Sequence, residues 1–276
     1  MPVTVAVVLF APLWLLAALV GVLILLALWE FFRLGVLAGF QGFVQWTTLC
    51  SLLVVLVQWQ DDLAGGAKGS AGWMLGPPGA VAGGIQLVLI LFLLGLGVSV
   101  SVTKLAASRR LAAAVASAGG LLLVALPLSY LVRIAGFPSG RRFLLLLFVV
   151  IWVGDTAAYF VGKGLGRLPM APALSPKKTW EGAAANLLGS VLAGYLASPW
   201  LPIPALSVLG LAAVANLAGQ AGDLLESAYK RSASVKDSGQ LLPGHGGMLD
   251  RIDSLTLAAP MAWCYLWWFA STGRLR

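Results

Sequence analysis

Long apolar runs recur along this chain from end to end, and they restrict its fold more than any other feature. A helix that crosses a bilayer needs about 20 consecutive, mostly apolar residues. Runs near this length predict spans at 3–32, 36–59, 81–102, 111–132, 143–161, 182–199, 203–229 and 252–270. These make eight spans, or nine if Pro12 divides the first run. The sequence therefore predicts an all-α, polytopic membrane protein.

The composition agrees with a lipid environment. Hydrophobic residues make up 60% of the chain and charged residues 10%, whereas a soluble domain carries about 25% charged residues. The formal net charge of +8 does not indicate nucleic-acid binding, because the basic residues are spread among short loops. Cys50 and Cys264 lie in separate apolar runs without metal-ligand spacing, so we expect packed or lipid-facing thiols.

The distribution of positive charge predicts an orientation. Twelve of the 18 Lys and Arg residues fall in alternate loops on one side of the predicted spans, and the rest fall on the other side. Cytoplasmic loops carry the excess of Lys and Arg. The richer side includes the loops at 174–182 and 230–251, so we expect these loops to face the cytoplasm.

Reactive side chains are concentrated in the second half of the chain. We predict a scaffold of helices at 1–142 and a catalytic region at 143–276. Asp155 lies inside the apolar run at 143–161, where an ionisable side chain costs about 2.5 to 3.5 kcal/mol. A functional role is the leading hypothesis, and pairing with a buried Lys or Arg is the alternative. Tyr159 follows one turn later on the same helix face.

The loop LSPKKTWEG, residues 174–182, precedes the sixth predicted span. Ser175, Lys178 and Thr179 would place hydroxyls and an ammonium at a helix start, where free backbone N–H groups favour a phosphate. Lysines that flank a membrane helix also help to set the orientation of the helix in the bilayer or contact lipid headgroups. This loop alone therefore leaves both interpretations open.

The segment from Gly222 to Leu255 holds a much denser set of charges. Asp223, Ser227 and Lys230 share one helix face by spacing, so we expect a carboxylate and an ammonium at the same spot. Asp250 and Asp253 open the last predicted span, three residues apart. The alternative is an ion-paired helix end at the membrane surface, but it explains neither the Gly-rich break at 242–247 nor the lone His245.

Carboxylates in this number predict a cation site. Asp223, Asp250 and Asp253, with Asp155 from another helix, offer the hard oxygen ligands that Mg²⁺ takes when it also binds substrate phosphates. The nearby basic residues would meet the phosphate charge: Lys230, Arg231, Lys236 and Arg251. Such a set suits phosphoryl-type transfer, which depends on positioning and charge stabilisation.

The stretch SAYKRSASVKDSGQLLPGHGGMLDRID, residues 227–253, resembles the signature of the phosphatidate cytidylyltransferases, also called CDP-diacylglycerol synthases. The stretches GDTAAYFVGKGLGRLPMAPALSPKKTWEG and GDLLES are similar to other blocks of that family. The resemblance covers about 152–255. It implies that CTP and phosphatidic acid react to give CDP-diacylglycerol and pyrophosphate with Mg²⁺, with a second cation as an option.

The resemblance also implies roles for individual residues. It makes Asp223, Lys230 and Asp250 the catalytic and metal-organising set. It assigns nucleotide and phosphate binding to Ser175, Lys178, Arg231, Lys236, Asp237, His245, Arg251 and Asp253, with Glu181 matching the same block as Ser175. It further implies an integral protein of a bacterial inner membrane, in contact with membrane lipids and able to form a homodimer.

Two rival functions use the same residues differently. An ion-coupled carrier would use Asp155 and Asp223 to relay protons or cations, but the charges gather at one membrane edge rather than along a path across the bilayer. A CTP-using lipid kinase of the polyprenol type would transfer the γ-phosphate, and the LPGHGGMLDRID block favours the cytidylyltransferase. The Asp-rich motif of CDP-alcohol phosphotransferases does not occur in this sequence.

Overall fold

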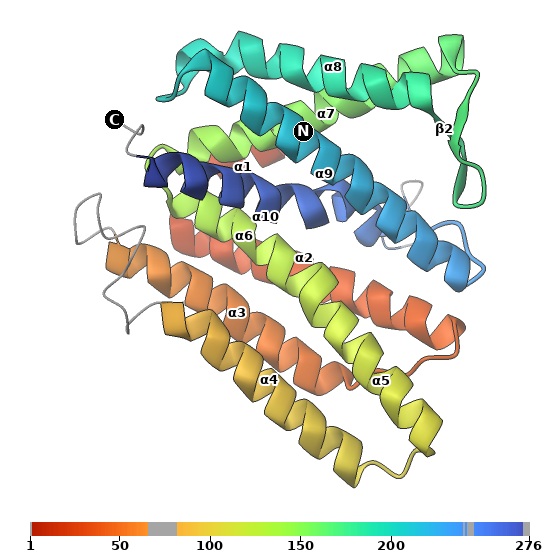
Figure 1. Cartoon of the computed structure of the whole chain (residues 1–276). Helices are drawn as coiled ribbons and strands as arrows, with labels where there is room; N and C mark the ends of the chain where they lie inside the picture. The colour runs from red at the N-terminus through yellow and green to blue at the C-terminus, as the bar shows by residue number, and fades with distance from the viewer. Residues whose placement is uncertain (1, 66–81, 240, 242–245, 273–276) are drawn as a thin grey trace. The chain divides into compact units, whose positions relative to one another are not determined.

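The computed structural model describes residues 2–65, 82–239, 241 and 246–272, and almost all of them are helical (Figure 1). The α-helices are α1 (Pro2–Phe10), α2 (Leu13–Leu37), α3 (Val44–Gly65), α4 (Ala82–Val102), α5 (Ala107–Gly119), α6 (Leu126–Gly136), α7 (Gly140–Leu165), α8 (Trp180–Ala197), α9 (Ala205–Ser232) and α10 (Leu249–Ser271). A π-helical segment, η1 (Gly120–Ala125), joins α5 to α6, and the 3-10 turn η2 (Ser198–Trp200) follows α8. The all-α prediction is confirmed.

Each predicted span coincides with helix. Five helical stretches are long and apolar enough to cross a membrane: Leu13–Leu37, Gly84–Val102, Ala107–Gly136, Gly140–Leu165 and Ala205–Ser232. The other predicted spans correspond to α1, α3, α8 and α10. The number of crossings stays a prediction.

Two prolines shape the helices. Pro12 lies between α1 and α2 with extended backbone, φ −63° and ψ 154°. Proline disfavours helical backbone in the residue before it, here Ala11, and has no N–H with which to continue the hydrogen bonds of α1. The first apolar run is therefore two helices. Pro127 follows η1, where the wider π-turn accommodates a residue that cannot donate to the preceding turn.

The chain packs as two units. Unit 1 comprises Met1–Ala11, Phe137–Arg231 and Ile252–Arg276, and unit 2 comprises Pro12–Gly136 and Ser232–Arg251. The units thus interleave along the sequence. The predicted division between scaffold helices at 1–142 and a catalytic region at 143–276 concerns function rather than packing, and it stays a prediction.

In unit 1, small residues let the helices approach closely. A Cβ on Gly189 of α8 would lie 2.9 Å from Ala157 of α7, and one on Gly194 would lie 2.8 Å from Ala212 of α9. On α9, Gly222 faces the backbone carbonyl of Asp253 on α10. Small residues at such crossings are typical of membrane helices, whose association depends on close packing.

In unit 2, polar side chains also pair inside the helix packing. Arg133 of α6 donates to Gln58 of α3 at 3.1 Å, and the Gln58 amide donates to the hydroxyl of Ser129 at 3.3 Å. Ser117 of α5 accepts from the backbone N–H of Phe43 at 2.7 Å. Buried polar groups are costly unless they are paired, so these bonds hold α3, α5 and α6 in register.

A short hairpin lies between α7 and α8, where the sequence predicted only a loop. Strands β1 (Pro169–Ala171) and β2 (Ser175–Thr179) pair antiparallel, with Pro169 opposite Thr179 and Ala171 opposite Ser175. Trp180 N–H donates to the Leu168 carbonyl at 3.0 Å. The hairpin thereby joins directly to the start of α8.

Candidate active site

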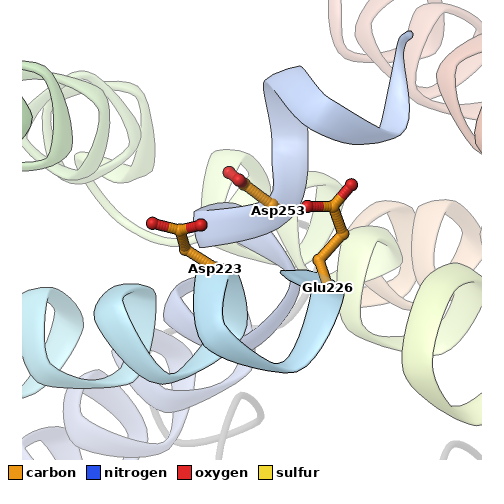
Figure 2. Close-up of side chains that lie close together, drawn as sticks. All are labelled: Asp223, Glu226 and Asp253. Carbon is orange, nitrogen blue, oxygen red and sulfur yellow. The ribbon is translucent and has the colours of Figure 1, made fainter. Parts of the chain in front are cut away.

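Three carboxylates come together where α9 and α10 meet in unit 1. Asp223 and Glu226 project from α9, and Asp253 projects from α10 (Figure 2). Their oxygens lie within 4.8 Å of one another. Gly222 makes this possible, because a Cβ there would lie 2.6 Å from the Asp253 carbonyl oxygen and would push the helices apart.

Two lysines pair with this cluster. Lys178 Nζ lies 2.6 Å from Asp223 Oδ2, and Lys230 Nζ lies 2.7 Å from Glu226 Oε2. The Glu226 side chain is 6% exposed and that of Lys230 is 13% exposed, so this pair is well shielded from solvent. Lys230 thus reaches the cluster that contains Asp223 through Glu226, which lies one helical turn before Lys230.

The structure thus unites four residues singled out from the sequence, Asp223, Asp253, Lys178 and Lys230. It adds Glu226, which sequence reasoning did not assign as a ligand. The spacing Glu226 to Lys230 is the i,i+4 pattern of a helical ion pair and would have indicated it. Such acid–base pairing also holds mutually repelling carboxylates together in a buried site.

Asp155 enters the same region from α7. Its carboxylate accepts a hydrogen bond from the Asn186 amide at 3.2 Å and also interacts with the charge of Lys178. Asn186 in turn accepts from Asn216, and Asn216 also donates to Ser190 Oγ at 2.6 Å. These bonds form a polar chain through α7, α8 and α9.

A cavity of about 350 Å³ opens beside these groups in unit 1. Its polar lining includes Asp155, Asn186, Gln220, Asp223, Lys177, Lys178 and Thr179, and its apolar lining includes Met170 and Leu224. Pockets for small ligands are concave with a few convergent polar groups. The cavity therefore offers an anion-binding wall of lysines beside a carboxylate wall.

The hairpin presents one of these walls. β2 carries Lys177 and Lys178 toward the cavity, and Thr179 ends the strand as the N-cap of α8, accepting from Gly182 N–H at 3.1 Å. The prediction of hydroxyls and an ammonium at a helix start is confirmed for Thr179 and Lys178. Ser175 begins β2 and is not among the cavity-lining residues.

Glu181, in the first turn of α8, holds the backbone that leads into strand β1. Both of its oxygens lie 3.2 Å from the backbone N–H of Leu168. Its own backbone N–H and that of Leu168 lower the pKa of Glu181 below its ordinary value. Arg231 of α9 donates to the carbonyl of Leu174 at 3.1 Å, so a predicted substrate-binding residue supports the hairpin.

The remaining predicted residues lie in or next to unit 2. Asp250 Oδ2 accepts from Ser238 N–H and Gly247 N–H at 2.9 and 2.8 Å. Lys236 and Asp237 are exposed, as is Arg251 at the start of α10. His245 lies outside the described residues. The roles predicted for these residues stay predictions.

The carboxylate cluster is chemically suited to a hard divalent cation. It offers oxygen ligands only, and Mg²⁺ takes oxygen at about 2.1 Å, which places opposite ligands about 4.2 Å apart. Each of the three carboxylates has an oxygen within 4.8 Å of the others, so small side-chain shifts would bring them onto one ion. Asp223, Glu226 and Asp253 therefore offer a set of oxygen ligands suited to Mg²⁺, and the predicted ligand roles of Asp155 and Asp250 stay predictions.

Fold and site together define a polytopic membrane protein with a carboxylate and lysine centre at one end of its helices. A family model described as the cytidylyltransferase family matches residues 1–269. The chain belongs to the cytidylyltransferase family.

Several relatives share substantial identity with this chain. A phosphatidate cytidylyltransferase of Synechocystis is 44% identical over 132 residues, which are 47% of this chain and 45% of the relative. One of Bacillus subtilis is 46% identical over 46% of this chain and 48% of the relative. One of Rickettsia prowazekii is 34% identical over 52% of this chain and 67% of the relative. The matched part thus spans about half the length of the first two.

Proposed function

We propose that this protein transfers the cytidylyl group of CTP to phosphatidic acid, giving CDP-diacylglycerol and pyrophosphate. One observation carries the proposal: in a membrane protein of the cytidylyltransferase family, a carboxylate cluster adjoins, through Asp223, a cavity that is also lined by two lysines. The relatives named phosphatidate cytidylyltransferase support the choice of lipid substrate.

The cation proposed for this site is Mg²⁺, held by Asp223, Glu226 and Asp253. Asp155, which lines the same cavity, is the candidate for a second cation together with Asp223. Asp250 retains its predicted metal-organising role from the start of α10. A bound Mg²⁺ would neutralise charge on the phosphates of CTP.

The lysines would meet the remaining negative charge. Lys178 and Lys177 line the cavity, and Lys230 lies beside Glu226. Their ammonium groups are proposed to contact phosphate oxygens as charge-assisted donors. Ser175, Arg231, Lys236, Asp237, His245 and Arg251 complete the proposed substrate-binding set.

The reaction needs no strong general base. The phosphate monoester of phosphatidic acid is already an anion, and its oxygen attacks the α-phosphorus of CTP in line. A new P–O bond forms to the α-phosphorus while the bond from this phosphorus to the bridging oxygen of the β-phosphate breaks. The electron pair leaves on pyrophosphate, so catalysis rests on positioning and electrostatics.

The location of the site is part of the proposal. The charge distribution supports a cytoplasmic active site, where CTP is available, in a bacterial inner membrane. A homodimer is proposed from the family resemblance alone.

The decisive experiment follows two labels. Purified protein in detergent is incubated with phosphatidic acid, Mg²⁺ and CTP labelled at either the α- or the γ-phosphate. We expect the α-label in the lipid fraction and the γ-label in pyrophosphate. γ-Label in lipid would indicate the kinase, and no transfer across a range of metals and lipids would favour the carrier.

A further inference from the structure

A second buried acid lies in unit 2, in the half of the chain where the sequence indicated only scaffold. Glu30 of α2 is 0% exposed. Its carboxylate accepts from Met248 N–H at 2.9 Å, from Leu249 N–H at 2.8 Å and from the Ser238 hydroxyl at 2.9 Å. A buried carboxylate needs such donors to offset its desolvation.

The backbone around Glu30 is built to admit its side chain. A Cβ on Gly239 or on Gly247 would clash with the Glu30 carboxylate. Gly247, the last residue of the Gly-rich break at 242–247, thus approaches Glu30 closely. Glycine permits this approach because it has no side chain.

The same segment holds Asp250 in place. Ser238 Oγ lies 2.9 Å from Asp250 Oδ2 as well as from Glu30 Oε2, so its single hydrogen is shared between two carboxylates. The N–H groups of Ser238 and Gly247 also donate to Asp250. Glu30 is thus one hydroxyl away from Asp250 and bonds the two amides that start α10.

We infer that Glu30 is a positioning residue, which anchors Ser238 and the start of α10 so that the Asp250 carboxylate is held in one orientation. The role rests on the proposed function, in which Asp250 organises the metal. Residues that orient a metal ligand typically contribute 10- to 100-fold to metal affinity or activity. A comparable contribution is expected of Glu30.

The anchoring is tested by Glu30→Gln, which keeps the size of the side chain but turns one acceptor oxygen into a donor. Amide hydrogen exchange at Gly247, Met248 and Leu249 is expected to accelerate by about 10-fold or more. Unchanged exchange would overturn the anchoring whether or not the protein is active.

The positioning is tested by Mn²⁺ binding, followed by EPR, and by the Mg²⁺ dependence of CDP-diacylglycerol synthesis. In Glu30→Gln, Mn²⁺ affinity and kcat are expected to fall by about 10-fold or more. Ser238→Ala, which removes only the shared hydroxyl, is expected to shift both in the same direction by a smaller factor. If Glu30→Gln does not fold, Mn²⁺ affinity and kcat of Ser238→Ala test the positioning of Asp250.

Ser117→Ala is the matched control, since it also removes a buried hydroxyl in unit 2 but not one bonded to Glu30 or Asp250. It should lower Tm without changing Mn²⁺ affinity. A loss of Tm alone in Ser238→Ala would reduce Glu30 to a structural role and overturn the inference. If unmutated protein makes no CDP-diacylglycerol, the proposed function fails with the positioning role, while the exchange data still decide the anchoring.

Discussion

At the scale of single residues, Asp223 links the carboxylate cluster to the cavity, because it belongs to both. Asp223→Asn keeps the shape but removes the charge that would bind Mg²⁺ and that pairs with Lys178. We expect kcat to fall by about 100-fold or more, measured as initial transfer of α-label from CTP to lipid. Asp250→Asn is expected to have the same effect through its predicted metal-organising role.

The control for these variants is Asp61→Asn, near the C-terminal end of α3. It removes one carboxylate from unit 2 and should retain unmutated activity. All variants should elute from size exclusion as the unmutated protein does. Full turnover in a folded Asp223→Asn variant would contradict the assignment of the site.

Lys178 gives a second test at this scale. Lys178→Gln removes the ammonium that faces the cavity beside Asp223. Because a hydrogen bond to a charged group contributes about 1.5 to 3 kcal/mol, we expect kcat/KM for CTP to fall by about 10- to 100-fold. Lys104→Gln, at an exposed lysine of unit 2, should leave it unchanged. If Lys178 only neutralises Asp223, Lys178→Gln will lower Tm with no change in kcat/KM.

The sequence predicted some site residues and missed others for identifiable reasons. Asp223 and Asp253 were found because charged residues are dense between Gly222 and Leu255, whereas Asp155 was found because charge is costly in an apolar helix. The same rule applied to Glu30, within LWEFFRLG, would have identified it. That Asp253 meets Asp223 and Glu226 was beyond sequence, since it depends on how closely α10 approaches α9.

At the scale of elements, hydrophobic runs predicted the helices well, because a membrane helix must satisfy its own backbone polar groups over a fixed length. The β1–β2 hairpin was missed. Its strands are short and contain Pro169 and Pro176, and proline weakens any strand prediction. Its pairing depends on contacts distant in sequence, including Arg231 to Leu174.

Gly154 tests the packing of three helices. A Cβ at Gly154 of α7 would clash with Asn186 and Ser190 of α8 and with Asn216 of α9. Gly154→Ala is therefore expected to destabilise the protein by about 1 to 3 kcal/mol, measured as a lower Tm in detergent. Gly164, in the same helix, has no neighbour within 4 Å of such a Cβ, so Gly164→Ala is the matched control. Equal effects of the two substitutions would contradict the packing argument.

At the scale of the whole molecule, the proposed reaction requires a lipid substrate and a soluble nucleotide to meet at a membrane surface. In unit 1, the residues of the site lie toward the end of α7, the start of α8, the end of α9 and the start of α10. If successive predicted spans alternate in direction, these four termini share one side of the membrane. A single orientation of α7 therefore determines which aqueous phase supplies the nucleotide.

That orientation can be measured with single cysteines at the two ends of α7. In a background with Cys50→Ala and Cys264→Ala, Ala173→Cys marks the hairpin and Ser139→Cys marks the opposite end, and both positions are exposed. The excess of Lys and Arg on the hairpin side predicts that an impermeant maleimide labels Ala173→Cys only in inverted vesicles and Ser139→Cys only in right-side-out vesicles. Detergent should expose both and serves as the control. The reverse pattern would put the site outside the cytoplasm, and labelling of both cysteines from one side would mean that α7 does not cross the membrane.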